Sequence, residues 1–258
     1  MPSRRGAGAE GLGGILLFLV AWQLAPQLGL SERYFPTLDK VLVALVAYLG
    51  QASFWGDVAQ TMLQWGVGLA IAVVAGVVIG MVIGLSGFLR KATYSTIEFL
   101  RPVPSVALIP LAILVFGDRI GSALLLVIYA AFWQVLLQVL YGINDVDPVA
   151  ESTAKSYGLG RLARVRYVIW PTTLPYLMTG VRLGSAVALI LAITAEMVIG
   201  NPGLGLQIAL TQSGGAIAKM YALIAMTGIL GVVINLFVRA LERRVLSWHV
   251  SVRSEVDA

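Results

Sequence analysis

The chain has no cysteine and only one histidine, His249, among its 258 residues. Disulfides, thiolate metal ligands and cysteine nucleophiles are therefore excluded, and one histidine cannot form a metal site by itself. No G-x-x-x-x-G-K-[ST] phosphate loop is present, so the chain cannot bind ATP by that device. Paired carboxylates and a Ser/His/Asp set are also missing. The sequence predicts neither an enzyme nor a resident metal or cofactor.

Charged residues are scarce at 12%, whereas 59% of the residues are hydrophobic. Several apolar runs reach the roughly 20 residues that cross about 30 Å of hydrocarbon. We expect an all-α membrane protein with about six transmembrane helices, at 11–28, 58–86, 98–117, 119–141, 173–199 and 219–241. The first run resembles a signal peptide, but it has no convincing cleavage site and five spans follow, so we expect a retained helix. The apolar run within 37–50 is too short to cross and predicts an interfacial helix on the outer face.

Lys and Arg number 18 against 13 Asp and Glu, a net charge of +5. In a soluble protein this excess would suggest nucleic acid. Beside apolar spans it is a topology signal instead, because basic residues gather on the cytoplasmic side. Most of them fall on one side when the N-terminus is cytoplasmic. Both termini and the segment 151–171 are therefore expected in the cytoplasm, and no nucleic-acid partner is expected.

The segment ESTAKSYGLGRLARVRYVIWP, Glu151 to Pro171, lies between two long apolar runs. Its polar and basic composition predicts a short helix, a break at Gly158 and a second, basic helix. We expect Gly158 to adopt a backbone conformation that a Cβ would strain. Such a helical excursion outside the membrane suits the docking of a cytoplasmic partner.

The third expected span contains Pro102, Pro104 and Pro110. Each proline removes a backbone donor, so this helix must be broken or kinked. The break serves either packing or a hinge that lines a pathway, because irregular backbone persists in a membrane only beside protein or water. In the second span, Gly76, Gly80 and Gly84 share one face. We expect these glycines mainly to permit close packing between helices, and a dimer contact is the second interpretation.

Polar side chains within the expected spans mark further candidates. Gln134 and Gln138, one turn apart in the fourth span, are expected inside the bundle. Arg182 lies about 10 Å into the fifth span. It snorkels to the interface, pairs with Glu98, or faces the pathway. We favour the pair with Glu98.

Glu196 stands near the outer end of the fifth span and is the only acid there. One interpretation is an interfacial acid paired with Arg119 or Lys219. The other is a gate residue that faces a dimer axis. Both interpretations stay open at this stage.

Three blocks resemble, in the same order, permease subunits of type I ABC importers of the aliphatic sulfonate, taurine and nitrate family. The segment 151–171 resembles the cytoplasmic coupling loop, with Ala154, Gly158 and Pro171 at the family's positions. Ser152 occupies the family's Glu position, and Glu151 stands one residue earlier. LRPVPSVALIPL, from Leu100, and AEMVIGNPGLGLQI, from Ala195, resemble two further signatures of that family.

The resemblance implies a single permease domain over 1–258 with the type I ABC importer (MetI-like) fold and a coupling loop at about 145–171. Its coupling contacts would come from Glu151, Ser152, Ala154, Lys155, Gly158 and Pro171. The pathway candidates that accompany it are Pro102, Pro104, Pro110, Gln134, Arg182 and Glu196.

The implied assembly lies in the bacterial cytoplasmic membrane as a multi-pass complex. It contains a second permease subunit in a homodimer, two cytoplasmic subunits that bind ATP and Mg²⁺, and an external substrate-binding protein. The resemblance implies import of a small solute, namely a sulfonate, taurine, nitrate, or a thiamine or riboflavin precursor.

Two rival functions come from other classes. A gradient-driven secondary transporter or channel would usually show inverted repeats and ionisable groups at mid-membrane. The sequence shows no convincing repeat and no acid in mid-span. A membrane scaffold without transport is the third hypothesis, against which the docking segment and the three prolines argue.

Overall fold

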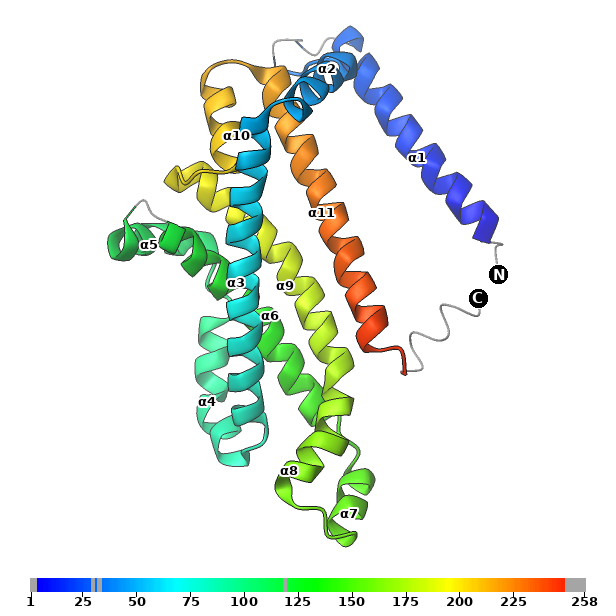
Figure 1. Ribbon diagram of the computed structural model, residues 1–258, viewed down its shortest axis with the longest axis vertical. Helices are drawn as coiled ribbons and strands as arrows, with labels where there is room; N and C mark the ends of the chain where they lie inside the picture. Colours follow the sequence, from blue (N-terminus) through cyan, green and yellow to red (C-terminus); the bar gives the residue numbers. More distant parts are fainter. Residues whose placement is uncertain (1–3, 29–30, 32–33, 118–119, 249–258) are drawn as a thin grey trace.

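The computed structural model describes residues 4–28, 31, 34–117 and 120–248, with side chains from Gly13 onward except Gln27, and these residues form helices without strands (Figure 1). The expected all-α fold is confirmed. The helices are α1 (Arg4–Leu24), η1 (Ala25–Leu28), α2 (Leu38–Leu49), α3 (Ala52–Gly84), α4 (Gly87–Leu100), η2 (Ser105–Leu108), α5 (Ile109–Phe116), α6 (Ile120–Asn144), α7 (Pro148–Ser156), α8 (Arg161–Arg164), η3 (Val165–Ile169), α9 (Trp170–Ile199), α10 (Leu204–Ser213) and α11 (Ile217–Val245).

Four helical stretches are long and apolar enough to cross a membrane: α3, α6, the run Arg161–Ile199 and α11. The pair Gly87–Leu100 and Ser105–Phe116 is bent by 85° and makes up to a fifth span. These five correspond to the last five expected spans. The first expected span corresponds to α1, whose described apolar part is Gly13–Leu24. Successive long helices alternate in direction, so α2 and α10 lie at one end of the molecule and α7 and α8 at the other (Figure 1).

Small residues on α3 let it pack tightly against α6. A Cβ added to Gly68, Gly76 or Gly80 would come within 2.5 to 2.8 Å of a valine of α6. The valines are Val127, Val135 and Val139, all fully buried. Any side chain at these glycines would push the helices apart, because protein interiors leave no spare volume. The predicted packing role is confirmed, and the partner helix belongs to the same chain.

The helix α1 stands apart from the main bundle and is joined to it at one end (Figure 1). There the ring of Trp22 lies 5.8 Å, between centroids, from the rings of both Phe35 and Tyr221. The indole N–H of Trp22 also donates to the Pro36 carbonyl at 3.0 Å. Helix α2, the expected interfacial helix, lies beside this aromatic cluster.

Two expected boundaries were wrong. The third span, expected at 98–117, begins earlier with α4 and contains its break at 101–104. The fifth, expected at 173–199, is continuous with the basic helix before it, since helix runs from Arg161 to Ile199. A π-helical turn, Val165–Ile169, lies just before Pro171. Such a turn lets the helix continue where proline provides no N–H.

Candidate coupling surface and translocation elements

The helix α7 has well-formed ends. The Asp147 carboxylate accepts a hydrogen bond from the Val149 N–H at 2.8 Å, and Pro148 occupies the first turn, where no N–H donor is needed. At the other end, Gly158 has φ = +75°. The Leu159 N–H donates to the Ala154 carbonyl at 3.0 Å, which closes the helix end. Gly158 therefore adopts a left-handed conformation that a Cβ would strain, as predicted.

Glu151 braces the coupling segment from inside. Its Oε1 lies 2.9 Å from Lys155 Nζ, one turn along α7, and 3.1 Å from Arg164 Nη1 of α8. The hydrogen bond and charge of Lys155, with a further contribution from Arg164, hold the pKa of Glu151 below its usual value. Glu151 therefore links α7 to α8.

The other expected coupling residues have different positions. Ala154 is buried, Ser152 and Lys155 are exposed, and Pro171 lies within the continuous helix rather than at the end of a loop. Buried Ala154 and the turn at Gly158 shape the segment, whereas Ser152 and Lys155 lie on its surface.

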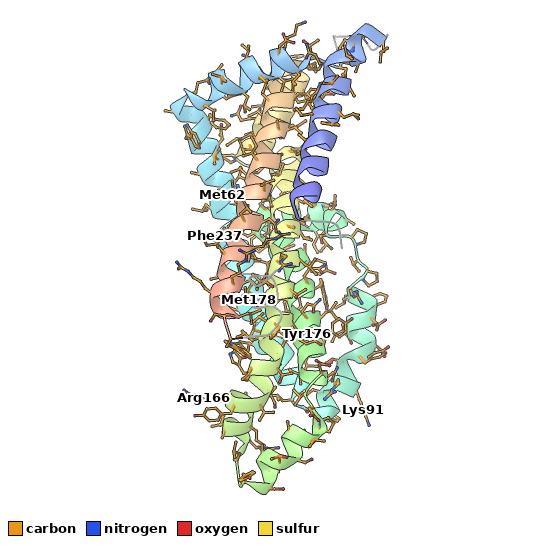
Figure 2. The ribbon with its side chains drawn as sticks, turned by 90° about the vertical axis from the view of Figure 1, so that its right-hand side faces the viewer. Met62, Lys91, Arg166, Tyr176, Met178 and Phe237 are labelled. Atoms are coloured by element: carbon orange, nitrogen blue, oxygen red, sulfur yellow. The ribbon has the colours of Figure 1, made fainter. Side chains whose placement is uncertain are left out.

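Exposed apolar side chains were missed by sequence reasoning. Val149, Tyr157, Leu162 and Tyr167 are 71%, 81%, 86% and 66% exposed. Large apolar groups displayed together outside a membrane mark a protein contact. The available signal was their apolar character within a polar segment. Figure 2 shows the basic side chain of Arg166 at this end of the molecule.

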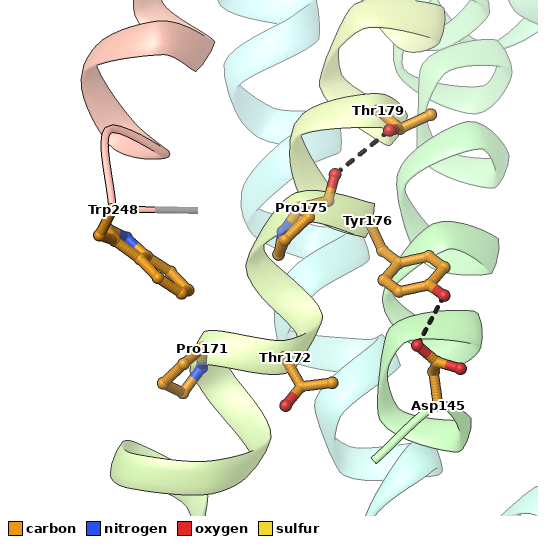
Figure 3. A pocket seen from close by; sticks show the side chains of 7 residues that line it. All are labelled: Asp145, Pro171, Thr172, Pro175, Tyr176, Thr179 and Trp248. Atoms are coloured by element: carbon orange, nitrogen blue, oxygen red, sulfur yellow. Dashed lines mark hydrogen bonds between the residues drawn. The ribbon is translucent and has the colours of Figure 1, made fainter. Parts of the chain in front are cut away.

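A cavity of about 520 Å³ lies above the coupling segment (Figure 3), lined by Asp145, Pro171, Thr172, Pro175, Tyr176, Thr179 and Trp248. The Tyr176 hydroxyl donates to Asp145 at 2.8 Å, which ties α9 to the end of α6. The Thr179 hydroxyl donates to the Pro175 carbonyl at 3.2 Å. The cavity therefore sits where the coupling segment becomes the spanning part of α9.

The proline-rich helix is broken, as predicted. Pro102 and Pro104 lie in the break, and the next helical segment leaves at 85°. Pro110 does not break a helix, because it stands in the first turn of α5, where the missing N–H is harmless. The Tyr129 hydroxyl donates to the Leu100 carbonyl at 2.8 Å, so protein satisfies a carbonyl that the break leaves free.

The inner side of this bend holds a cavity of about 750 Å³, lined by Leu100, Val103, Leu108, Leu111, Phe116, Gly121, Leu124, Leu125, Ile128, Tyr129 and Phe132. Its lining is almost wholly apolar. A polar solute would lose its hydration there without replacement, which is strongly unfavourable. This cavity is therefore no solute site.

Arg182 forms an ion pair, but the expected partner was wrong. Its guanidinium contacts the carboxylate of Glu242 on α11, whereas Glu98 is exposed on α4. Because α9 and α11 run in opposite directions (Figure 1), the last turns of α11 lie beside the first half of α9. Sequence reasoning did not consider Glu242, which lies just beyond the expected sixth span.

Glu196 fits neither of its two expected positions. Its side chain is fully buried, and it accepts hydrogen bonds from the Thr61 hydroxyl at 3.0 Å, the Gln64 amide at 3.1 Å and the Gly205 N–H at 2.9 Å. Arg119 lies outside the described residues, and Lys219 is not a hydrogen-bond or ion-pair partner of Glu196. Full burial within one chain also leaves no side-chain surface to face a dimer axis. Glu196 instead fastens the α9–α10 turn to α3.

Gln134 and Gln138 are partly buried on α6. A Cβ added to Gly180 of α9 would come 3.1 Å from the Gln138 Cβ and 3.2 Å from the Gln134 carbonyl oxygen. Both therefore lie at the closely packed α6–α9 contact, inside the bundle as expected.

The family model of the binding-protein-dependent transport system inner membrane component matches residues 72–247. The chain belongs to this family. The taurine transport system permease protein TauC of Escherichia coli K12 is 32% identical to this permease over 242 residues, which cover 91% of this chain and 87% of TauC. The nitrate import permease protein NrtB of Leptolyngbya laminosa is 26% identical over 196 residues, with 76% and 70% covered.

A solved amino acid ABC transporter, crystallised with histidines, superposes on this permease with a TM-score of 0.65 at 21% identity, covering 78% of this chain and 97% of the other. That likeness concerns the fold. With the family match, it makes the protein a membrane-spanning permease subunit of a type I ABC importer. Such a subunit implies ATPase and substrate-binding partners. The resemblance stated from the sequence is confirmed.

Proposed function

We propose that this permease works as a homodimer in the bacterial cytoplasmic membrane, with both termini in the cytoplasm. Two separate subunits bind ATP and Mg²⁺ and hydrolyse the ATP, and an external protein delivers a small anionic solute. The chain has no phosphate loop of its own, which supports a separate site of hydrolysis.

The observation that carries this proposal is the coupling surface at the α7–α8 end. Exposed Tyr157 and Leu162 supply apolar contacts for an ATPase. The turn at Gly158 sets the course of the chain between α7 and α8, and the Glu151 ion pairs add a weak brace. The surface is thus preformed, and docking on it orders few additional side chains.

The continuity of α8 with α9 supplies the mechanical link. The helical run Arg161–Ile199 has 39 residues, which corresponds to about 58 Å at 1.5 Å per residue. Movement of the docked ATPase therefore displaces α9 along its whole length. At its outer end Glu196 passes the displacement to α3 and to the α9–α10 turn. Import then needs rigid-body movement and no covalent chemistry on this chain.

The second permease subunit has a natural place on α4. Among the described residues, this helix buries none of its own side chains in the single chain. It leaves Phe88, Tyr94 and Phe99 at 78%, 63% and 75% exposure. Part of this surface would be covered by the second copy.

The relatives support an anionic solute. TauC is named for taurine, which carries a sulfonate, and NrtB for nitrate. Both solutes present negatively charged oxygens. We infer that the solute of this permease shares that feature.

Reconstitution tests the proposal. The permease with its ATPase and binding protein should import taurine or nitrate into liposomes only when ATP is supplied. The permease alone should import neither. Solute flux through the permease alone, driven by an ion gradient, would instead establish a secondary transporter.

A further inference from the structure

Arg101 is a cation at membrane depth that takes part in none of the ion pairs described above. It follows directly after α4, which has 14 residues. At 1.5 Å per residue the end of α4 lies about 21 Å from its cytoplasmic start. The hydrocarbon layer is about 30 Å thick, so the Arg101 backbone lies well inside it.

The charge of Arg101 has no acidic partner among the residues that the structure describes. The described ion pairs join Glu151 to Lys155 and Arg164, and Arg182 to Glu242. The side chain of Arg101 is exposed in the single chain. Because a bare charge is strongly unfavourable in lipid, Arg101 must face water, a bound anion or the second permease subunit.

The surroundings of Arg101 also point to water. Ser95, Thr96 and Glu98 are exposed on the last two turns of α4. The backbone directly after Arg101 is irregular, and irregular backbone at membrane depth lines a water-filled path or lies against protein. The opposite side of the bend is the apolar cavity at Val103 and Leu108. Neither Arg101 nor Glu98 lines that cavity, so the charged groups at the bend lie outside its apolar pocket.

We propose that Arg101 binds the anionic oxygens of the solute at the bend, halfway along the pathway. A guanidinium offers parallel N–H donors that match a sulfonate or a planar oxyanion. Glu98, three residues earlier on the same helix face, supplies a counter-charge for a solute that also carries an ammonium group. A single exposed cation binds weakly enough to release its solute, as transport requires.

This inference rests on the proposed function, and Arg182 is no rival site because Glu242 neutralises it. The α4–α5 bend is positioned to act on the pathway because α5 and η2 contact both α6 and α9. A displacement of α9 therefore reaches the elements that hold Arg101.

The first test compares Arg101→Gln and Arg101→Lys in the reconstituted complex. Loss of the guanidinium should lower ATP-driven uptake of taurine and nitrate about tenfold or more. The complex should still assemble with its ATPase subunits, and Arg101→Lys should recover part of the uptake because it restores the charge. Lys91→Gln is the matched control, since it removes a positive charge from the cytoplasmic start of the same helix.

Equal uptake by wild type, Arg101→Gln and Lys91→Gln would overturn the inference. A wild-type complex without ATP-driven uptake would instead count against the proposed function. In that case the second test, which needs no knowledge of the solute, decides about Arg101.

The second test uses the absence of native cysteines. A thiol introduced by Ile97→Cys, one turn before Arg101, should react with sulfonatoethyl and trimethylammonioethyl methanethiosulfonate in the assembled complex. The ratio of anionic to cationic reagent rates should fall roughly tenfold when Arg101→Gln is added, because a nearby cation concentrates anions. Val78→Cys, on the apolar face of α3, should stay unreactive. An unreactive Ile97→Cys, or a ratio unchanged by Arg101→Gln, contradicts an anion site on a water-filled path.

Discussion

The two ends of the Arg161–Ile199 helix are fastened by carboxylates in opposite ways. At the N-terminal end, Glu151 is partly exposed and bonds to two cations. At the other end, Glu196 is fully buried and bonds only to neutral donors. Water can replace the partners of Glu151, so the brace is weak and adjustable. Nothing replaces the partners of Glu196, so that joint is strong and fixed.

This difference suits a helix that transmits movement from one end to the other, as the proposed function requires. The end that meets the ATPase has to yield when the partner moves. The outer end has to carry the displacement to α3 and α10 without slack. Four predictions probe the difference, beginning with the largest effect.

Glu196→Ala should be the most damaging change. It leaves the Thr61 hydroxyl, the Gln64 amide and the Gly205 N–H without their acceptor and opens a cavity. The loss of stability should be on the order of 3 kcal/mol. Thermal unfolding in detergent measures it, with Lys219→Ala as the control at the same end of the molecule. A Glu196→Ala protein as stable as the control would show that the outer joint is not fixed by this carboxylate.

Gly158→Val should be the next most harmful change. A β-branched residue at φ = +75° costs about 1 to 3 kcal/mol locally. That strain disturbs the α7–α8 turn while leaving the membrane helices inserted. Uptake should be lost or uncoupled from ATP hydrolysis, as measured by uptake and ATPase rates of the complex.

Gly160 provides the control for that substitution. It has φ = −62°, and an added Cβ would meet nothing within 4 Å. Gly160→Ala should therefore be close to neutral. Normal coupled transport by Gly158→Val would remove the coupling role from this turn.

The Arg182–Glu242 pair should show an intermediate effect. Removing either partner strands a partly buried charge, which should cost about 1 to 3 kcal/mol. The double variant Arg182→Gln with Glu242→Gln should recover most of that loss, and Arg182→Gln with Glu98→Gln should not. Thermal unfolding of the wild type, the two single variants and the Arg182→Gln/Glu242→Gln double variant gives the coupling energy between Arg182 and Glu242. Rescue by Glu98→Gln instead would restore the pairing expected from the sequence.

Local features of this chain could be predicted from the sequence, because near neighbours determine them. The break at Pro102 and Pro104 follows from their missing donors, and the strained turn from Gly158 in a polar segment. Close packing of α3 against another helix follows from glycines four residues apart, although the sequence did not identify α6 as that helix. Each depends on residues within one or two turns.

Long-range pairing could not be predicted in the same way. The partner of Arg182 is 60 residues away in α11, and the two side-chain donors to Glu196 lie more than 130 residues away in α3. Hydropathy places helices along the chain, but it does not say which helices are neighbours or how deep each residue lies. Depth assigned span by span therefore paired Arg182 with Glu98 and placed Glu196 at the surface.

Acid should loosen the cytoplasmic brace with the smallest effect of the four. The pKa of Glu151 is lowered from 4.5, chiefly by Lys155. Because the folded pKa lies below the unfolded one, the stabilisation is present above pH 4.5 and is lost as the pH falls through the folded value. Between pH 5 and 8 the brace should not change. In the wild type, hydrogen exchange of the α7 amides, corrected for intrinsic rates, should therefore be the same at pH 6 and at pH 8. The Glu151→Gln variant should exchange slightly faster than the wild type at both pH values. The gain should be small, since exposed ion pairs contribute little. An equal change at the α9–α10 turn would mean that the two ends are not fastened independently.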